Sequence, residues 1–452
     1  MNTRSYIFTF MLLMASLQLA AQSSILDQYI QEGLKSNLQL QQEQLNYEKS
    51  EQSLQLARAL FMPQISANAT YQIAGGGRKI SFPVGDLLNG VYSTLNQLTG
   101  TTNFPQVQNV NEQFLANDFH DTKLRVIQPL FNPDIYFAYK AQKELTTVQQ
   151  AQKKAYENEL KFNIASAYFQ YLQTEEGLLI LKKTKVLLNE LLKINQSLVA
   201  NAKATKDVVL NAEYELSKIE QQLAENEKNN QVARSYFNFL LNRDLNHEII
   251  RDTTMMVTAS QQQSIDQLTA QAIQQRQEIK QLEGGLRANQ QLVGLQKGSA
   301  FMPKLSAVGD VGYQGFQYKF DNSQQYWLVQ FGLTWDIFKG GEKQVKIQQA
   351  KIDQQVMTNR MDQLKKQIEL QVIQAHYELE MANKTLEASQ SGVRSTERSF
   401  QIIQSKYREG QAILLEYLDA QNKLTTARLT QSINHYELLR KEAALQKTIA
   451  TL

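Results

Sequence analysis

The chain has 452 residues, with 47 Lys and Arg residues against 44 Asp and Glu residues and a formal net charge of +3. This near balance argues against a nucleic-acid-binding protein, and 42% hydrophobic residues exclude a disordered chain. Cys is absent, which excludes disulfide bonds, thiolate metal sites and a catalytic Cys.

The first 21 residues have the composition of a secretory signal peptide. Arg4 precedes an apolar stretch over 6–19, and the small residues Ala20 and Ala21 follow before a polar start. A positive beginning, a short apolar centre and small residues at the end are what a signal peptide needs. We therefore expect residues 1–21 to be removed on export and the fold to begin after them.

Prolines divide the rest of the chain into helical and non-helical parts. All six lie at positions 63, 83, 105, 129, 133 and 303, so the stretches 134–302 and 304–452 contain none. Because Pro costs roughly 3 kcal/mol inside a helix, these stretches predict long helices. We expect helices over 24–60, 134–202 and 205–242 in the first half, and over 264–300, 341–408 and 411–450 in the second.

Alternation of apolar and polar residues predicts four strands between these helices. They cover 64–74, 119–131, 304–318 and 325–338, and the clearest alternation places Trp327, Val329 and Phe331 on one face. Strands of about ten residues are long enough to cross a bilayer when tilted. Two soluble hairpins would explain the same pattern. A long loop, 75–118, joins the first pair of strands, and a short one joins the second.

The chain also carries an internal duplication. The tripeptide Phe61-Met62-Pro63 recurs at Phe301-Met302-Pro303, and Ser24-Ile25 recurs with the same offset at Ser264-Ile265. The order of expected helices and strands repeats as well. The sequence therefore predicts a first repeat over 22–243, an equatorial linker over 244–263 and a second repeat over 264–452.

The long helix of the second repeat has an apolar seam. Large residues follow one another every seven positions, the spacing of a left-handed coiled coil. The seam consists of Val372, Leu379, Leu386, Val393 and Phe400. A simple antiparallel coiled coil or a four-helix bundle would account for this seam equally well.

One local motif follows the seam. Tyr407-Arg408-Glu409-Gly410 precedes a run from 413 to 419 that includes Glu416 and Asp419. A weaker counterpart lies over 203–212, with Ala202 where a Gly is expected. Together with the duplicated element order, these motifs resemble the TolC-like outer membrane efflux protein family over essentially the whole mature chain.

The resemblance implies a mainly α fold with a small β part. Duplicated long antiparallel coiled-coil helices would form a periplasmic α-barrel, and four strands per chain would contribute to a trimeric, twelve-stranded outer-membrane β-barrel with the loop 75–118 outside. The protein would be a homotrimer in the outer membrane of a Gram-negative bacterium, in contact with lipid. It would serve as the exit duct of a tripartite efflux or type I secretion system, together with a periplasmic adaptor and an inner-membrane transporter.

The resemblance also assigns roles near the two periplasmic turns. The pore constriction and gate would comprise Glu416, Asp419, Asp207 and Tyr407. The adaptor would dock on Ala202, Lys203, Lys206, Arg408, Gly410 and Gln411. Ala412 departs from the family pattern, which has an Arg that helps lock the gate, so that particular bond is expected to be absent.

Two other protein classes fit parts of the pattern. A trimeric coiled-coil structural or adhesive surface protein would explain the seam but not the duplicated strand pairs. A periplasmic adaptor also has a long helical hairpin, but it needs domains richer in Gly and Pro. The four His residues lie far apart and no nucleophile–base pattern appears, so we expect no enzyme, no cofactor, no metal and no nucleic-acid partner.

Overall fold

The computed structural model describes residues 25–252 and 263–452. The expected signal peptide and half of the linker 244–263, residues 253–262, lie outside these residues. The chain divides into two compact units. Unit 1 comprises Met1–Glu51, Glu144–Arg287 and Gln354–Leu452, and unit 2 comprises Gln52–Lys143 and Ala288–Asp353. In the described ranges, no helix combines the length and the apolar character that a membrane crossing requires.

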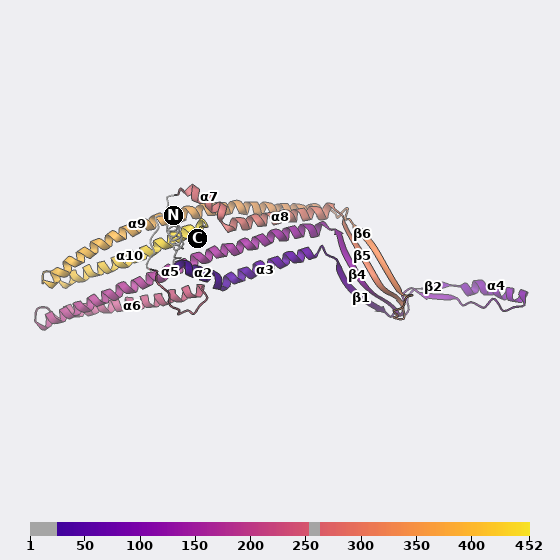
Figure 1. Cartoon of the computed structure of the whole chain (residues 1–452), viewed down its shortest axis with the longest axis horizontal. Helices are drawn as coiled ribbons and strands as arrows, with labels where there is room; N and C mark the ends of the chain where they lie inside the picture. Colours follow the sequence, from indigo (N-terminus) through magenta and orange to yellow (C-terminus); the bar gives the residue numbers. More distant parts are fainter. Residues whose placement is uncertain (1–24, 253–262) are drawn as a thin grey trace, which may run out of the picture. The chain divides into compact units, whose positions relative to one another are not determined.

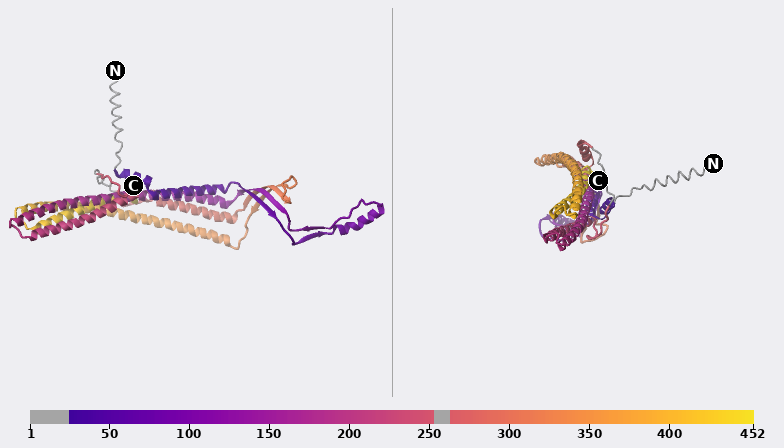
Figure 2. Two further views of the ribbon diagram at one scale, coloured as in Figure 1. Left: turned by 90° about the horizontal axis from the view of Figure 1, so that it is seen from below. Right: turned by 90° about the vertical axis from the view of Figure 1, so that its left-hand side faces the viewer.

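Unit 1 is helical and is built around two long antiparallel pairs (Figure 1). The first pair is α5 (Pro133–Ala200) with α6 (Asp207–Leu240), and the second is α9 (Glu342–Arg408) with α10 (Leu414–Thr448). At their turns the two pairs lie next to each other, as the end-on view in Figure 2 shows. Shorter helices complete the unit: α2 (Ile25–Ser36), α7 (Ile265–Gln275) and the first parts of α3 (Leu38–Ala59) and α8 (Gln277–Phe301), whose later residues belong to unit 2.

Two of the expected helices are divided by a single residue. Asn37 separates α2 from α3, and its side chain accepts the Leu40 N–H at 3.0 Å while donating to the Leu240 carbonyl at 2.9 Å. Arg276 separates α7 from α8 and is extended, with φ −63° and ψ 133°. Asn competes for backbone hydrogen bonds and favours caps, and the Leu240 carbonyl at the end of α6 supplies the second partner of its side chain. The ranges 24–60 and 264–300 are therefore two helices each.

The cores of unit 1 follow the seams between these helices. One cluster surrounds Tyr168 and Phe237, and another surrounds Ile368 and the seam residue Val372, all four fully buried. A third lies beneath the turns around Leu188 and includes Phe400. Of the seam residues, Val372, Leu379, Leu386 and Phe400 are buried and Val393 is half-buried. The heptad spacing thus marks the face of α9 that packs inside the chain.

Unit 2 contains a four-stranded antiparallel sheet in the order β1-β4-β5-β6. The strands are β1 (Gln64–Gln72), β4 (Phe119–Phe131), β5 (Lys304–Phe316) and β6 (Gln325–Thr334). The two central strands come from different repeats and pair with each other, with Arg125 opposite Asp310. Each repeat therefore supplies one edge and one central strand.

The sheet has one polar and one apolar face. On the polar face, Arg125 donates two hydrogen bonds to Asp310, Nε to Oδ1 at 2.8 Å and Nη2 to Oδ2 at 2.7 Å. On the opposite face, large apolar side chains are exposed, including Ile65 at 70%, Trp327 at 77% and Phe331 at 69%. An exposed apolar face of this kind is typical of a surface that contacts another protein or a membrane.

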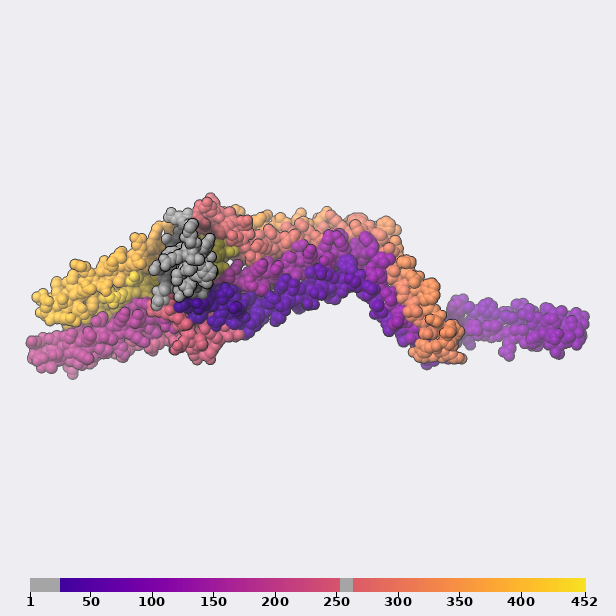
Figure 3. Space-filling view, in the orientation of Figure 1, coloured from indigo at the N-terminus to yellow at the C-terminus, as the bar shows by residue number. Residues whose placement is uncertain are grey.

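The connection from β1 to β4 is structured. It forms β2 (Lys79–Phe82), α4 (Val84–Thr99) and β3 (Val110–Gln113), with β2 and β3 paired, and it extends beyond the end of the sheet (Figure 3). The range 75–118 therefore contains one helix and a two-stranded ribbon, where the sequence suggested a loop. Gly100, in the left-handed region at φ +67°, ends α4 and sends the chain back along it.

Candidate functional site

The two long helical pairs of unit 1 end in matching turns. Ala202 follows α5 and Gly410 follows α9, and both have left-handed backbones, at φ +52° and +74°. In each turn an N–H bonds back across five residues, from Lys203 to the Leu198 carbonyl at 2.8 Å and from Gln411 to the Lys406 carbonyl at 2.7 Å. This is the Schellman pattern of helix ends, in which the left-handed position favours Gly. The duplication therefore extends to the backbone of both turns.

Ala202 makes a stability prediction possible within this matched pair. Because the left-handed region costs a non-Gly residue about 1 kcal/mol, Ala202→Gly should raise the stability of unit 1 by roughly that amount. Gly410→Ala should lower it by a similar amount. Melting temperatures of the two variants in detergent check this. A shift of both in the same direction would contradict the equivalence of the turns.

A groove of about 1070 Å³ runs between the two turns. It brings together six of the residues that the sequence singled out, namely Lys203, Asp207, Tyr407, Arg408, Gly410 and Asp419. Four others, Ala202, Lys206, Gln411 and Glu416, lie in or beside the same turns but do not line the groove. The ends of α5 and α9 and the starts of α6 and α10 thus bring the expected gate and docking residues into one region of unit 1.

A buried hydrogen-bond chain crosses the base of this groove. The Tyr407 hydroxyl donates to Asn195 Oδ1 at 2.6 Å, and Asn195 Nδ2 donates to the Val208 carbonyl at 2.9 Å. Asn195 is fully buried on α5. The chain therefore connects the end of α9 through α5 to the start of α6. We name it the tip link (Tyr407, Asn195 and Val208).

Aromatic packing holds the donor of the tip link in place. The Tyr407 ring lies 5.2 Å from the Tyr417 ring, which in turn lies 5.4 Å from Phe400. Burial, and to a lesser degree the neighbouring Tyr417, raises the pKa of Tyr407 above its usual value. The hydroxyl consequently stays protonated and able to donate well above neutral pH.

Asn195 was not among the residues that the sequence suggested. Its only signal is that it is an amide within the largely apolar run of α5, and such a residue is equally common on a solvated face. What identifies it is its distance to Tyr407, 212 residues away in the chain. Only the folded arrangement of the two hairpins supplies that contact.

The carboxylates of the expected constriction are exposed in the single chain. Asp419 pairs with Lys423 on its own helix at 2.7 Å, with both side chains more than half exposed. Asp207 accepts a hydrogen bond from the Thr205 hydroxyl at the start of α6. Glu416 lies in the first turn of α10 and is exposed. Exposed carboxylates at one end of a unit can form a charged ring when several copies surround an axis.

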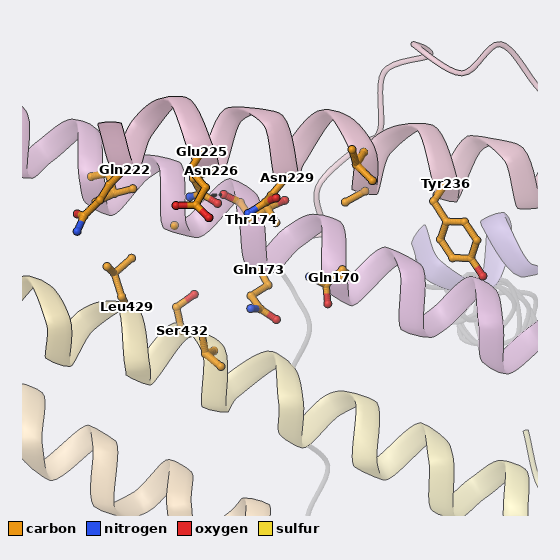
Figure 4. A pocket seen from close by; sticks show the side chains of 15 residues that line it. Gln170, Gln173, Thr174, Gln222, Glu225, Asn226, Asn229, Tyr236, Leu429 and Ser432 are labelled. Carbon is orange, nitrogen blue, oxygen red and sulfur yellow. Dashed lines mark hydrogen bonds between the residues drawn. The ribbon is translucent and has the colours of Figure 1, made fainter. Parts of the chain in front are cut away.

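A second groove, of about 640 Å³, lies where α5, α6 and α10 meet (Figure 4). Amide side chains of α6, including Asn226, face Thr174 of α5 there. Asn230 donates to the Thr174 hydroxyl at 3.0 Å, and a Cβ at Gly177 would lie 2.5 Å from Asn226 Nδ2. Glycine and the buried amides thus fix how closely and in which register α6 packs on α5. We assign this groove to packing within the hairpin.

Comparison with known proteins identifies a related family. Residues 268–451, which contain α9, α10 and the second turn, match the family model described as "Outer membrane efflux protein". The second half of the chain is therefore similar to the outer membrane efflux protein family. The search of curated protein sequences found no match.

Solved structures extend the similarity over almost the whole length of the chain. It is similar to the outer-membrane channel OprN, at 17% identity and a TM-score of 0.77, over 95% of this chain and 90% of that one. It is also similar to the Campylobacter jejuni CmeC outer membrane channel, at 17% identity and a TM-score of 0.74, over 94% of this chain and 86% of that one. The open state of the Neisseria gonorrhoeae MtrE outer membrane channel is similar at 17% identity and a TM-score of 0.76, over 94% of this chain and 88% of that one. At these identities the similarity establishes the fold, which agrees with the expected TolC-like fold class.

Proposed function

We propose that this chain is one subunit of a homotrimeric outer-membrane efflux channel that conducts substrates passively out of the periplasm. The observation that carries the proposal is the sheet of unit 2. Within the described residues, β1 pairs only with β4 and β6 only with β5, so both edges present unpaired backbone groups. Such edges pair readily with another chain. Pairing β6 of one copy with β1 of the next would close three sheets into a barrel with its apolar face toward lipid.

The edges of unit 1 support the same arrangement of three copies around one axis. Thr184 of α5 contacts Thr425 of α10 at 3.1 Å, and Lys441 of α10 pairs with Glu378 of α9 at 2.9 Å. Lys185 of α5 pairs with Glu220 of α6 at 2.8 Å. Away from the turns, these contacts join the helices in the order α6, α5, α10 and α9, with α6 and α9 at the edges. At the turns, Tyr407 of α9 also contacts Asn195 of α5, and Asn422 of α10 donates to Glu215 of α6.

Both edge helices carry exposed apolar side chains. On α9 these are Leu370, Tyr377 and Met381, at 64%, 57% and 59% exposure. On α6 they are Leu210, Tyr214, Val232, Tyr236 and Phe239, each more than half exposed. Two different edges that complement each other form a head-to-tail contact, which closes into a ring when the rotation allows. We therefore assign these stripes to contacts between neighbouring subunits.

The turn region of unit 1 is the proposed gate and docking site. Glu416, Asp419 and Asp207 would line the constriction, where three copies of each carboxylate attract cations. Lys203, Lys206 and Arg408, with Ala202, Gly410 and Gln411, would contact a periplasmic adaptor that couples the channel to an inner-membrane transporter. Exposed Ile413 and Leu415, at 63% and 71%, add apolar area to this surface.

Conductance of the purified protein in planar bilayers tests the channel function. We expect small, mostly closed currents with a preference for cations, because the tip link holds the turns together and the constriction is acidic. A protein that inserts into the bilayer as a stable oligomer yet never conducts would contradict the proposal.

A further inference from the structure

One face of helix α4 is held against the segment that follows it by the amide side chains of two Asn residues. Asn89 exchanges two hydrogen bonds with the backbone of Val107, at 2.9 and 2.8 Å. Asn96, seven residues further on, does the same with Phe104, at 2.7 and 3.0 Å. The Tyr92 ring lies 5.7 Å from the Phe104 ring between these two contacts. This face of α4 is therefore fully occupied by the returning segment 101–109.

The opposite face of α4 is apolar and open. Leu87, Val91 and Leu98 are 70%, 54% and 78% exposed. Together with Thr94, these residues are spaced four, three and four positions apart, which is the a/d pattern of a coiled coil. A helix that packs on a globular core usually has a wider apolar stripe. We call these four residues the α4 seam (Leu87, Val91, Thr94 and Leu98).

The charge of the segment indicates which partner covers the α4 seam. Residues 80–122 contain no Lys or Arg, and Asp86 is the only charged residue over 84–109. Helices that lie on a membrane surface usually carry Lys and Arg on their polar face, so lipid headgroups are a poor match. Identical uncharged seams can face one another without like-charge repulsion, and depletion of charge is typical of interface centres.

We propose that the α4 seam packs against the α4 helices of the other copies, so that three of them form a short coiled coil on the threefold axis. This inference rests on the trimer of the proposed function. A helix of 16 residues has little stability of its own in water. The trimer supplies the missing stability, since it holds the three helices at a high effective concentration. The assembled helices would narrow the outer end of the duct.

Disulfide cross-linking tests the proposal, because the chain contains no Cys. Val91→Cys lies in the α4 seam, and three thiols near one axis come within the reach of a disulfide bond. Mild oxidation of the purified trimer should join two of the three chains, at a yield that does not change on dilution. Ser93→Cys is the matched control: it lies on another face of the helix, where the native side chain bonds Gln106. It should give little or no dimer.

Three outcomes can be told apart. Dimer formation by Val91→Cys but not by Ser93→Cys supports the coiled coil. An intact trimer without cross-linking at position 91, or with equal cross-linking at both positions, overturns the coiled coil and leaves the channel function standing. A sample that is not trimeric before oxidation overturns both the coiled coil and the proposed function.

Discussion

Tyr407→Phe should raise the open probability of the channel on the order of tenfold. The substitution keeps the ring and its packing on Tyr417 but removes the hydroxyl that donates to Asn195 at 2.6 Å. It leaves Asn195 Oδ1 unpaired in a fully buried residue, which costs about 1–3 kcal/mol. If opening separates the two hairpins, that cost falls on the closed state alone and shifts the population toward the open state.

Single-channel recording of matched variants measures this effect. Tyr136→Phe is the control, because Tyr136 is 44% exposed and lies in the first turn of α5, at the opposite end of that helix from the tip link. It should leave the open probability unchanged. A double-mutant cycle of Tyr407→Phe with Asn195→Ala should show coupling between the two positions. Independent effects, or an open probability equal to that of the parent protein in an intact trimer, would remove the tip link from the gate.

Removing the charge of Glu416 should reduce the cation preference of the channel several-fold. Three carboxylates around one axis repel one another and attract cations, so a neutral ring loses most of the selectivity. Asp419→Asn should have a smaller effect, because Lys423 lies 2.7 Å from that carboxylate and compensates part of its charge. The isosteric changes Glu416→Gln and Asp419→Asn avoid altering the shape of the constriction.

Reversal potentials across a salt gradient give the selectivity directly. Glu387→Gln removes one negative charge from an exposed position on α9, away from the turns, and serves as the control. It should leave the reversal potential unchanged. If Glu416→Gln and Glu387→Gln behave alike, the acidic residues at the turn do not form the constriction.

The helical framework was accessible from the sequence because its signals are local and repeated. Exclusion of Pro predicts the long helices, and the heptad from Val372 to Phe400 predicts the face of α9 that is buried. The strands were accessible for the same reason, since alternation over ten residues distinguishes the polar from the apolar face. These features together support the fold class.

The features that the sequence did not predict depend on contacts between distant residues. Asn37 divides a helix because the end of α6 offers the Leu240 carbonyl, and this acceptor is 203 residues away. The helix α4 lies in the connection between the first two expected strands, and Asn89 and Asn96 tie it to the returning segment 101–109. Asn195 acquires its role only through Tyr407, and nothing in its neighbourhood in the chain indicates that partner.

The native mass of the detergent-extracted protein tests the central claim most directly, since every proposed role of the turns and of the sheet edges requires three copies. The account predicts a trimer, extracted from the outer-membrane fraction, that dissociates only on heating. A monomer would contradict the account, because the apolar stripes on α6 and α9 would then have no partners. An oligomer that leaves the membrane without detergent would also contradict it, because the apolar face of the sheet would then have no lipid to contact.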